Sequence, residues 1–274
     1  MNYRHAFHAG NHADVFKHAA LTLLLEHLRA KPQPFAVLDT HAGIGVYDLT
    51  SDEARRSPEY VEGVGRIFGR ELAAAPAYSR LIAELNPRGL AAYPGSPEIT
   101  RSLLRDGDRL IACELHPQDA QALKARYRSD RRVSVHHRDG YEAIGALVPP
   151  PELRGLVFID PPFEAADETD RLVRAVTAGL KRWPTGIFAV WYPIKDRRIG
   201  AALSAAATQS PWPKALRAEL SPFSWEETGL PGSGLLICNA PWKLDEALAA
   251  LCEALSGLLG AGRSHWAVDQ LTPA

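Results

Sequence analysis

Short apolar runs alternate with longer segments of helical character along most of the chain. The apolar runs lie within residues 35–45, 109–117, 132–140, 155–163 and 185–193. The segments between them have the composition and spacing of helices, at about 53–90, 117–127 and 167–181. Because buried parallel strands appear as continuous apolar runs, this alternation predicts a parallel sheet with helices on both faces.

The two ends of the chain extend this pattern. Asn11 can cap a first helix, in which Phe16, Ala20 and Leu24 follow a helical period, and Pro32 ends it. After residue 200, the sequence predicts two strands, at 215–221 and 233–242, then a helix at about 244–259 and a terminal edge strand at 265–271. No internal repeat or low-complexity linker interrupts the chain, so we expect a single domain over residues 1–274.

Composition narrows the class of protein. The 274 residues have a formal net charge of −1 and an apolar fraction of 46%, which fits a globular chain whose total charge predicts no partner. Cys113, Cys238 and Cys252 do not occur at CxxC spacing, which argues against a thiolate zinc site and favours a reducing compartment. The chain begins with polar residues and lacks an apolar run of roughly 18 residues, so we expect a cytoplasmic protein that binds no membrane.

Acidic residues follow four of the predicted strands. Asp39, Glu114, Asp139 and Asp160 each lie at the end of an apolar run. In a doubly wound sheet, ligands bind beyond the carboxyl ends of the strands, so we expect these side chains at one rim. Four carboxylates at one rim would repel one another unless a ligand supplies hydrogen-bond donors.

The first of these strands runs into a turn with two glycines, Gly43 and Gly45. The turn lacks the third glycine of the dinucleotide fingerprint, which disfavours a nicotinamide-dependent dehydrogenase. Asp39 and Glu114 lie about 75 residues apart, against roughly 20 in a dinucleotide fold, so the helical stretch between them is expected to be an insertion. A plain strand-to-helix turn would explain the two glycines equally well.

The tetrapeptide Asp160-Pro161-Pro162-Phe163 has the most specific chemistry. Two prolines fix the backbone and remove two amide donors, which leaves a carboxylate and carbonyl groups pointing outward as acceptors. Acceptors at Asp160 and at the Pro161 carbonyl can hold both hydrogens of an exocyclic amine and free its lone pair for attack. Phe163 offers a face on which a base can stack, worth roughly 1–3 kcal/mol. The alternative is an aspartate that only caps a proline turn.

The chain also resembles a known family. The segment DPPF is similar to the motif of S-adenosylmethionine-dependent amino-methyltransferases, and DTHAGIG is similar to their glycine-rich cofactor loop. Nearly the whole length resembles the RlmJ family of bacterial 23S ribosomal RNA adenine-N6 methyltransferases, through the ordered segments YRHAFHAGNHADVFKH, LDTHAGIGVYDL, YPGSP, ELHP, RDGYEA, IDPPFE, WYPIK and SGLLICNAPWKL.

This resemblance implies a fold, a reaction and a partner. The fold would be an α/β, Rossmann-like class I methyltransferase sheet covered by helices on both faces, with a small helical subdomain inserted at about 47–93. Residues 1–18 would form a segment over the active site. The reaction would be in-line transfer of a methyl group from S-adenosylmethionine to N6 of a specific adenine in 23S rRNA, either protein-free or at an early assembly stage. We expect a monomer that needs no metal.

The resemblance also assigns residues to roles. Catalysis would depend on Asp160, Pro161 and Phe163. The cofactor would contact His18, His41, Gly43, Ser96, Glu114, Asp139, Gly140 and Asp160. The resemblance gives Tyr3 to the target adenosine. From the residues themselves, we expect Arg4 and His5 to face the RNA and Phe163 to stack on the base. Within the cofactor site, Glu114 would accept from the ribose hydroxyls and Asp139 would meet the adenine edge. The family usually has tyrosine where this chain has Phe163, a change that keeps stacking but removes a phenol hydrogen bond.

Four histidines lie within the first eighteen residues. The spacing of His5, His8 and His12 could suit a metal, but no carboxylate or thiolate forms a matching ligand set. These imidazoles could instead satisfy backbone groups around a tight turn. The interpretation that we favour is that the segment covers the active site, with His18 toward the cofactor and His5 toward the RNA.

Basic residues gather locally although the total charge is nearly neutral. We expect them near the rim of the sheet, where they would contact RNA phosphates. The clusters are Arg131, Arg132 and Arg138, then Lys195, Arg197 and Arg198, and in the insertion Arg55, Arg56 and Arg66.

Two other functions stay open at this point. The first is a DNA amino-methyltransferase acting on adenine N6 or cytosine N4, although no target-recognition domain is evident. The second is a non-catalytic RNA-binding protein that keeps the fold, although all four acidic strand ends are present. Without the resemblance, the residues distinguish neither RNA from DNA nor one target nucleotide from another.

Overall fold

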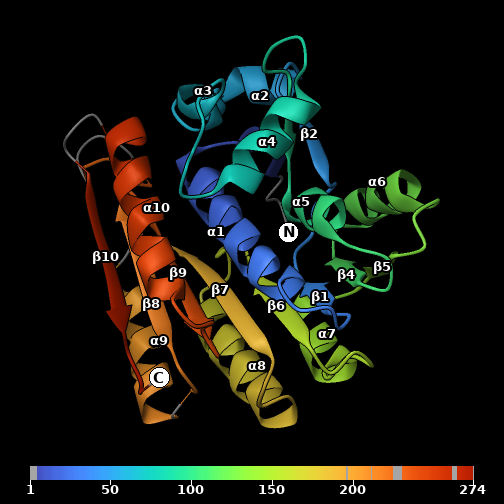
Figure 1. Ribbon diagram of the computed structural model, residues 1–274, viewed down its shortest axis with the longest axis vertical. Helices are drawn as coiled ribbons and strands as arrows, with labels where there is room; N and C mark the ends of the chain where they lie inside the picture. Colours follow the sequence, from blue (N-terminus) through green and yellow to red (C-terminus); the bar gives the residue numbers. More distant parts are fainter. Residues whose placement is uncertain (1–4, 196, 211, 225–229, 261–263, 274) are drawn as a thin grey trace.

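The core of the protein is an eight-stranded sheet. A computed structural model describes residues 5–195, 197–210, 212–224, 230–260 and 264–273. The strands of the sheet are β1 (Ala36–Asp39), β4 (Arg109–Glu114), β5 (Val133–His137), β6 (Gly155–Ile159), β7 (Ile187–Pro193), β8 (Leu216–Ser221), β9 (Ser233–Cys238) and β10 (His265–Gln270). Across the sheet they follow the order β10-β8-β9-β7-β6-β1-β4-β5 (Figure 1).

The sheet is mixed, which corrects the prediction of a parallel sheet. Strands β7, β6, β1, β4 and β5 are parallel neighbours, as the sequence predicts. Strand β9 pairs antiparallel with both β7 and β8, and β10 pairs antiparallel with β8. A parallel pair needs a crossover of roughly a dozen or more residues, usually a helix. Residues 222–232, between the neighbouring strands β8 and β9, are too few for such a crossover.

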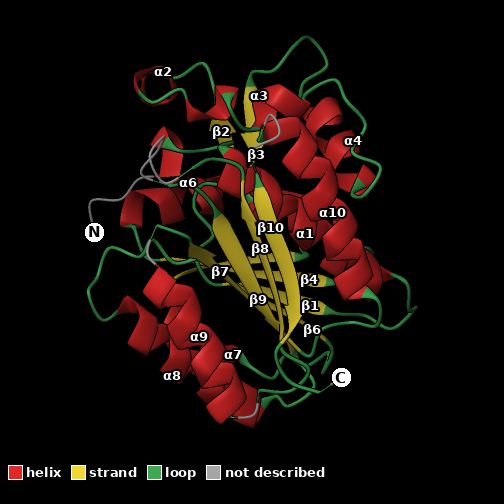
Figure 2. Ribbon diagram, turned by 90° about the vertical axis from the view of Figure 1, so that its left-hand side faces the viewer, coloured by secondary structure: helices red, strands yellow, loops and turns green. Residues whose placement is uncertain are grey.

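Helices cover both faces of the sheet (Figure 2). On one face lie α1 (His12–Arg29), α5 (Ser96–Leu103), α6 (Pro117–Tyr127) and α10 (Leu244–Leu259). On the other face lie α7 (Gly140–Leu147), α8 (Glu168–Arg182) and α9 (Arg197–Gln209). The predicted class, a Rossmann-like α/β sheet with helices on both faces, is therefore confirmed.

Strand β6 illustrates why the central strands read as continuous apolar runs. Leu156 and Phe158 belong to the core under α1, whereas Val157 and Ile159 belong to the core under α7 and α8. Successive side chains of a strand point to opposite faces, so a strand covered on both sides needs apolar residues at every position. Each such side chain contributes about 1.5–3 kcal/mol by its burial.

The chain between β1 and β4 forms a separate group of short elements, above the sheet in Figure 1. They are β2 (Val46–Asp48), α2 (Asp52–Arg56), η2 (Glu59–Val61), α3 (Val64–Ile67), α4 (Pro76–Leu85) and β3 (Ala92–Pro94). Strands β2 and β3 form a two-stranded antiparallel sheet where the segment leaves and returns. The sequence predicted helices here but not this short sheet, because three-residue strands leave no clear period.

Helix α1 is buried on nearly every side. Asn11 caps it as predicted, since its side-chain oxygen accepts from the Asp14 amide at 2.9 Å. Fourteen of its eighteen residues are buried, so the helix does not have the solvent-facing stripe of an ordinary amphipathic helix. It packs against α4, α5, α10 and β9, and a single-turn helix η1 (His5–Phe7) precedes it.

No helix in the described ranges has the length and apolar content to cross a bilayer.

Candidate active site

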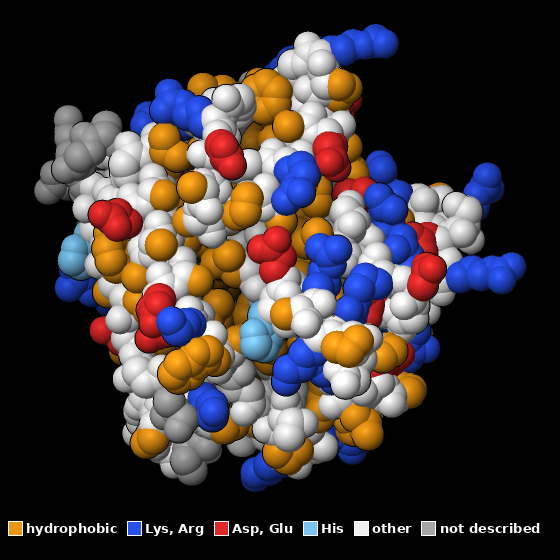
Figure 3. All heavy atoms as spheres, viewed as in Figure 1, with side chains coloured by type: hydrophobic (Ala, Val, Ile, Leu, Met, Phe, Trp, Pro, Cys, Tyr) orange, Lys and Arg blue, Asp and Glu red, His pale blue; other side chains and the backbone are white. Residues whose placement is uncertain are grey.

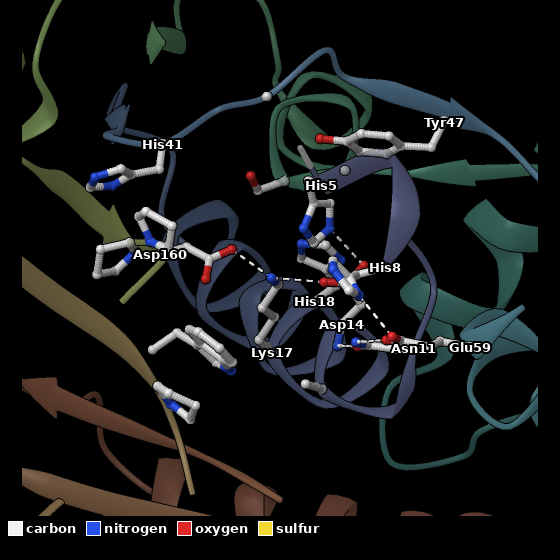
Figure 4. A pocket seen from close by; sticks show the side chains of 18 of the residues that line it. His5, His8, Asn11, Asp14, Lys17, His18, His41, Tyr47, Glu59 and Asp160 are labelled. Atoms are coloured by element: carbon white, nitrogen blue, oxygen red, sulfur yellow. Dashed lines mark hydrogen bonds and ion pairs between the residues drawn. The ribbon is translucent and has the colours of Figure 1, made fainter. Parts of the chain in front are cut away.

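A cavity of about 580 Å³ opens where α1 meets the carboxyl ends of the central strands. Strand ends contribute His41, Glu114, Asp160 and Trp191 to its wall. The helix side contributes residues of η1 and of the first half of α1 (Figure 4). The volume suits a small-molecule site, for which roughly 300–1,000 Å³ is typical.

One side of the cavity contains an ammonium group between two carboxylates. Lys17 Nζ lies 2.7 Å from Asp14 Oδ1 and 2.5 Å from Asp160 Oδ2 (Figure 4). Asp14 and Lys17 lie one turn apart on α1, whereas Asp160 directly follows β6. The packing of α1 on the sheet therefore creates this bridge. We name the cluster of Asp14, Lys17 and Asp160 the lysine end of the cavity.

The charges of the lysine end depend on one another. The side chains of Asp14 and Lys17 are 1% and 4% exposed. Burial alone would lower the pKa of Lys17, but Asp14 and Asp160 outweigh it and raise that pKa above its ordinary value. Burial likewise opposes ionisation of Asp14, yet His5 and Lys17 hold the pKa of Asp14 well below its ordinary value. Both groups are thus charged at neutral pH, in a place where an unpaired charge would cost several kcal/mol.

The proline corner after β6 faces this lysine. Pro161 and Pro162 line the cavity together with Asp160. Asp160 faces the cavity as an acceptor and already accepts from Lys17, a contact that the sequence did not predict. Phe163 does not line the cavity: it has a φ of +50°, and its ring meets the Trp191 ring edge-on at 6.0 Å between centroids. A positive φ is uncommon for a bulky residue, and strain of this kind is often found at functional sites.

The opposite side of the cavity holds a carboxylate by backbone amides. Glu114 Oε2 accepts from the Gly43 amide at 2.8 Å, and Oε1 accepts from the His116 amide at 2.7 Å. Burial raises the pKa of Glu114, and the amides only partly oppose this. Gly43 has a φ of +61°, and a Cβ there would lie 2.0 Å from the Tyr47 hydroxyl oxygen, so only glycine fits. We name the cluster of Glu114, Gly43 and His116 the amide end.

Asp39 lies between the two ends and differs from both. Its side chain is fully buried, and within the described ranges neither carboxylate oxygen has a hydrogen bond of normal geometry. Burial raises the pKa of Asp39 to about 7, and the nearby Ser96 hydroxyl and His41 amide offset only part of that effect. Asp39 is not among the residues that line the cavity.

Three more residues with a predicted cofactor contact line the cavity: His18, His41 and Ser96. The His18 ring is buried, which lowers its pKa well below the ordinary value, and Nδ1 lies 2.8 Å from the Tyr93 hydroxyl. Burial lowers the pKa of His41 to about 4, so both imidazoles are neutral at pH 7. Ser96 begins α5 and is 4% exposed.

Asp139 and Gly140 do not line the cavity. Asp139 Oδ1 accepts from the Tyr141 and Glu142 amides and so caps α7, while Oδ2 lies 2.9 Å from the Arg171 guanidinium. Gly140 packs against the backbone of Thr40, where a Cβ would lie 2.3 Å from the carbonyl oxygen. In this conformation both residues have structural partners at the end of β5.

The early histidines bind protein groups at three separate places. His5 Nε2 lies 2.9 Å from Asp14 Oδ2, and His8 Nδ1 lies 2.7 Å from Glu59 Oε1 in η2. His12 Nε2 lies 2.9 Å from the Leu230 carbonyl. The described residues include no group of three or more His, Cys, Asp or Glu arranged to hold a metal ion. The segment thus joins α1, the insertion and the region before β9.

Comparison with known proteins identifies the family. A family model described as "Ribosomal RNA large subunit methyltransferase D, RlmJ" matches residues 32–272. Over its full length the chain is 40% identical to proteins of Haemophilus influenzae and Escherichia coli, each named Ribosomal RNA large subunit methyltransferase J and each matched over 99% of its length. The chain belongs to this methyltransferase family. A crystal structure of a Legionella pneumophila protein superposes with a TM-score of 0.87 and 33% identity, over 96% of this chain and 98% of that one.

The family assignment confirms the resemblance found in the sequence, but sequence reasoning missed part of the site. Lys17 and Asp14 were not predicted, nor was a lysine contact to Asp160. One signal was present: Asp14 and Lys17 have opposite charges at i and i+3 spacing, in a helix whose neighbouring positions are apolar. That spacing usually marks a solvated helix surface, and only the packing of α1 shows that the pair is buried.

The positions of the basic residues match the prediction only in part. Lys195 lines the cavity, and Arg138 follows β5 at its carboxyl end. Arg131 and Arg132 precede β5, so they lie at the opposite end of the sheet and not at the predicted rim. Arg66 donates to the Leu259 carbonyl at the end of α10 and pairs with Glu62. Tyr3 and Arg4, predicted to contact substrate, lie outside the described residues.

Proposed function

We propose that this protein transfers a methyl group from S-adenosylmethionine to N6 of an adenine in 23S ribosomal RNA. The observation that supports the proposal is a single cavity with Asp160 and Pro161 on one side and Glu114 and Gly43 on the other. One side offers acceptors for an amine, and the other offers a carboxylate beside a glycine turn. The curated relatives are named for ribosomal RNA of the large subunit, which points to this substrate.

The amide end fits S-adenosylmethionine by its chemistry. Glu114 keeps unused lone pairs after its two amide contacts, so it would accept from the ribose hydroxyls. The turn at Gly43 brings the backbone to the cavity without a side chain, which would accommodate the methionine part. His18, His41 and Ser96 would line the remaining wall. When bound, the cofactor supplies an electrophilic methyl group on a positively charged sulfur.

We also assign Asp139 and Gly140 to the cofactor, at its adenine edge. Because Asp139 already caps α7 and pairs with Arg171, this contact would use a lone pair that those donors leave free.

The lysine end would receive the target base. Asp160 and the Pro161 carbonyl would accept the two N–H groups of the adenine amine, which turns its lone pair toward the amide end. Lys17 holds the Asp160 carboxylate in place through its contact of 2.5 Å. The base must leave its stack to reach this depth, and Phe163 would stack on it from the edge of the corner. Since Lys17 stays protonated, the proton that the methylated nitrogen releases would pass to Asp160 or to water.

The segment at residues 1–18 would cover the bound base and cofactor, with Tyr3, Arg4 and His5 toward the RNA. Within this segment, His5, His8, Asp14, Lys17 and His18 are among the residues that already line one wall of the cavity. Lys195 and Arg138 would contact phosphates at the rim. We further propose a monomeric, cytoplasmic protein with one methyltransferase domain, residues 1–274, in which about 47–93 are an insertion. Its substrate would be 23S rRNA that is protein-free or early in assembly.

The test is incubation of the purified protein with labelled S-adenosylmethionine and one of four substrates. These are transcribed 23S rRNA, assembled large subunits, 16S rRNA and double-stranded DNA. Digestion to nucleosides should give labelled N6-methyladenosine from transcribed 23S rRNA, less or none from assembled subunits, and none from 16S rRNA or DNA. Label in N6-methyladenine or N4-methylcytosine of the DNA would favour a DNA amino-methyltransferase. RNA binding without transfer would favour a non-catalytic binding protein.

A further inference from the structure

We propose that Asp14 is a positioning residue for methyl transfer: it holds the Lys17 ammonium so that Asp160 can release it to receive the target amine. The inference rests on the proposed function and concerns how the lysine end is prepared for the substrate. It starts from a conflict in the structure, since the carboxylate that should accept the amine already accepts from Lys17 at 2.5 Å.

Asp14 collects donors from three directions. Oδ2 accepts from the Gly10 amide at 2.8 Å and lies 2.9 Å from His5 Nε2, while Oδ1 lies 2.7 Å from Lys17 Nζ (Figure 4). A buried carboxylate is retained only where its charge is compensated. Capping does not explain it, because Asn11 already provides the side-chain cap of α1. The Gly10 contact is a structural role, but the contact of Oδ1 with Lys17 serves no turn or cap.

The second carboxylate changes what Lys17 can do. If Asp160 were its only anion, the buried ammonium would stay on Asp160, because leaving it would strand a charge without a partner. With Asp14 at 2.7 Å, the ammonium keeps a partner when Asp160 turns to an amine hydrogen. Asp14 thus lets Asp160 exchange a lysine contact for a substrate contact.

The total charge of the lysine end leads to the same conclusion. Counted without the His5 ring beside Asp14, the two carboxylates and one ammonium of the lysine end leave one net negative charge beside the place where a sulfonium would lie. The attacking nitrogen gains positive charge as the new bond forms, and a net negative environment stabilises that charge. Without the charge of Asp14, the lysine end would be neutral and would no longer stabilise the positive charge on the attacking nitrogen. We therefore expect a larger loss of transition-state stabilisation than of cofactor affinity.

The direct test is Asp14→Asn, with Asp108→Asn as a matched control. Asp108 is also a carboxylate that is only 1% exposed, and it pairs with Arg105 three residues earlier. Two backbone amides donate to it as well. It lies before β4, however, at the end of the sheet away from the cavity. We expect Asp14→Asn to lower kcat at least ~10-fold, with the Kd for S-adenosylmethionine changed by less than about threefold. Asp108→Asn should lower Tm but leave kcat within about twofold.

The pairing with Lys17 is tested by a double-mutant cycle with Lys17→Met, measured in single turnovers. If Asp14 acts through Lys17, adding Asp14→Asn to Lys17→Met should reduce the rate by less than about threefold. The inference would be wrong if Asp14→Asn slowed methyl transfer as strongly in the Lys17→Met protein as in wild type. It would also be wrong if the loss of rate simply matched the loss of folded protein.

A second measurement leaves Asp14 intact, in case its variants do not fold. Nitrogen-15 NMR of lysine-labelled protein reports whether the Lys17 ammonium is protected from exchange. In Asp160→Asn, we expect the Lys17 signal to remain protected because Asp14 still holds it, and its disappearance would overturn the inference. A failure of the proposed function would appear differently, as no transfer by the wild-type protein.

Discussion

The two ends of the cavity each hold a carboxylate at the end of a parallel strand, yet they hold it in opposite ways. At the lysine end, Asp160 pairs with a side-chain ammonium on α1. At the amide end, Glu114 is fixed by two backbone N–H groups, from Gly43 and His116. A side-chain cation can change partners during a reaction, whereas main-chain donors cannot move. The contrast teaches that one end is suited to chemistry and the other to holding a ligand.

The difference also follows the surroundings of each strand. The chain beyond β6 faces the polar first half of α1, whereas the chain beyond β4 faces the glycine turn that follows β1. Figure 3 shows many Lys and Arg side chains on the outer surface of the molecule in this view. Lys17, which is 4% exposed, is set apart from such solvated charges by its burial.

The largest effect is expected from Asp160→Asn, which removes the carboxylate that pairs with Lys17 and would accept the target amine. Methyl transfer should fall about 1,000-fold, equivalent to about 4 kcal/mol of transition-state stabilisation, since the amide cannot accept from the amine and from Lys17 alike. Cofactor affinity should change less than about threefold, as Glu114 is untouched. Labelled-methyl transfer and calorimetry measure the two effects. If Asp160→Asn lost cofactor affinity together with rate, the assignment of catalysis to the lysine end and cofactor binding to the amide end would be wrong.

A large effect on stability is expected from Asp39→Asn, between the two ends. The pKa of Asp39 is about 7 when folded, against an ordinary value near 3.8. Between these values the folded state binds more protons than the unfolded state, so the unfolding free energy falls as pH rises through this window. Asp39→Asn removes the titrating group and so abolishes that fall. The unfolding free energy of the variant minus that of wild type should therefore be about 2–4 kcal/mol larger at pH 8 than at pH 4.5. Urea unfolding at both pH values measures this, and an equal difference at each would contradict it.

A moderate effect is expected from Glu114→Gln, the matching change at the amide end. Both carboxylate oxygens accept from amides, so the NH2 group of glutamine must face a donor and lose one contact. The Kd for S-adenosylmethionine should rise about 10-fold, or about 1.4 kcal/mol, with kcat at saturation within about threefold. If kcat of Glu114→Gln fell as far as kcat of Asp160→Asn, the two ends would not have different roles.

The smallest effect is expected from Phe163→Tyr, which adds a phenol hydroxyl to the aromatic ring of the proline corner. Phe163 lies edge-on to Trp191 and does not line the cavity, so a phenol adds no contact to either end. Rate and cofactor affinity should both stay within about threefold of wild type. A rise of 10-fold or more in kcat would mean that the hydroxyl reaches the base and that stacking alone is insufficient.

Much of the fold and part of the site could be predicted from the sequence. The parallel strands, the insertion before Glu114 and the proline corner after β6 have local signals: apolar runs, spacing and two consecutive prolines. The antiparallel strands β8 to β10 were also located, but their direction was not, since direction depends on the path of the chain between them. Phe163 was expected in the cavity and packs instead on Trp191.

The sequence by itself determined the α/β class, the acidic strand ends and the family, because each depends on residues close together in the chain or on a long ordered set of motifs. Only the tertiary structure decided which charges meet. Asp14 and Lys17 look like a surface pair until α1 packs across the sheet and brings them to Asp160. The physical reason is that burial and long-range contact set the energy of a charge, and neither has a local pattern in sequence.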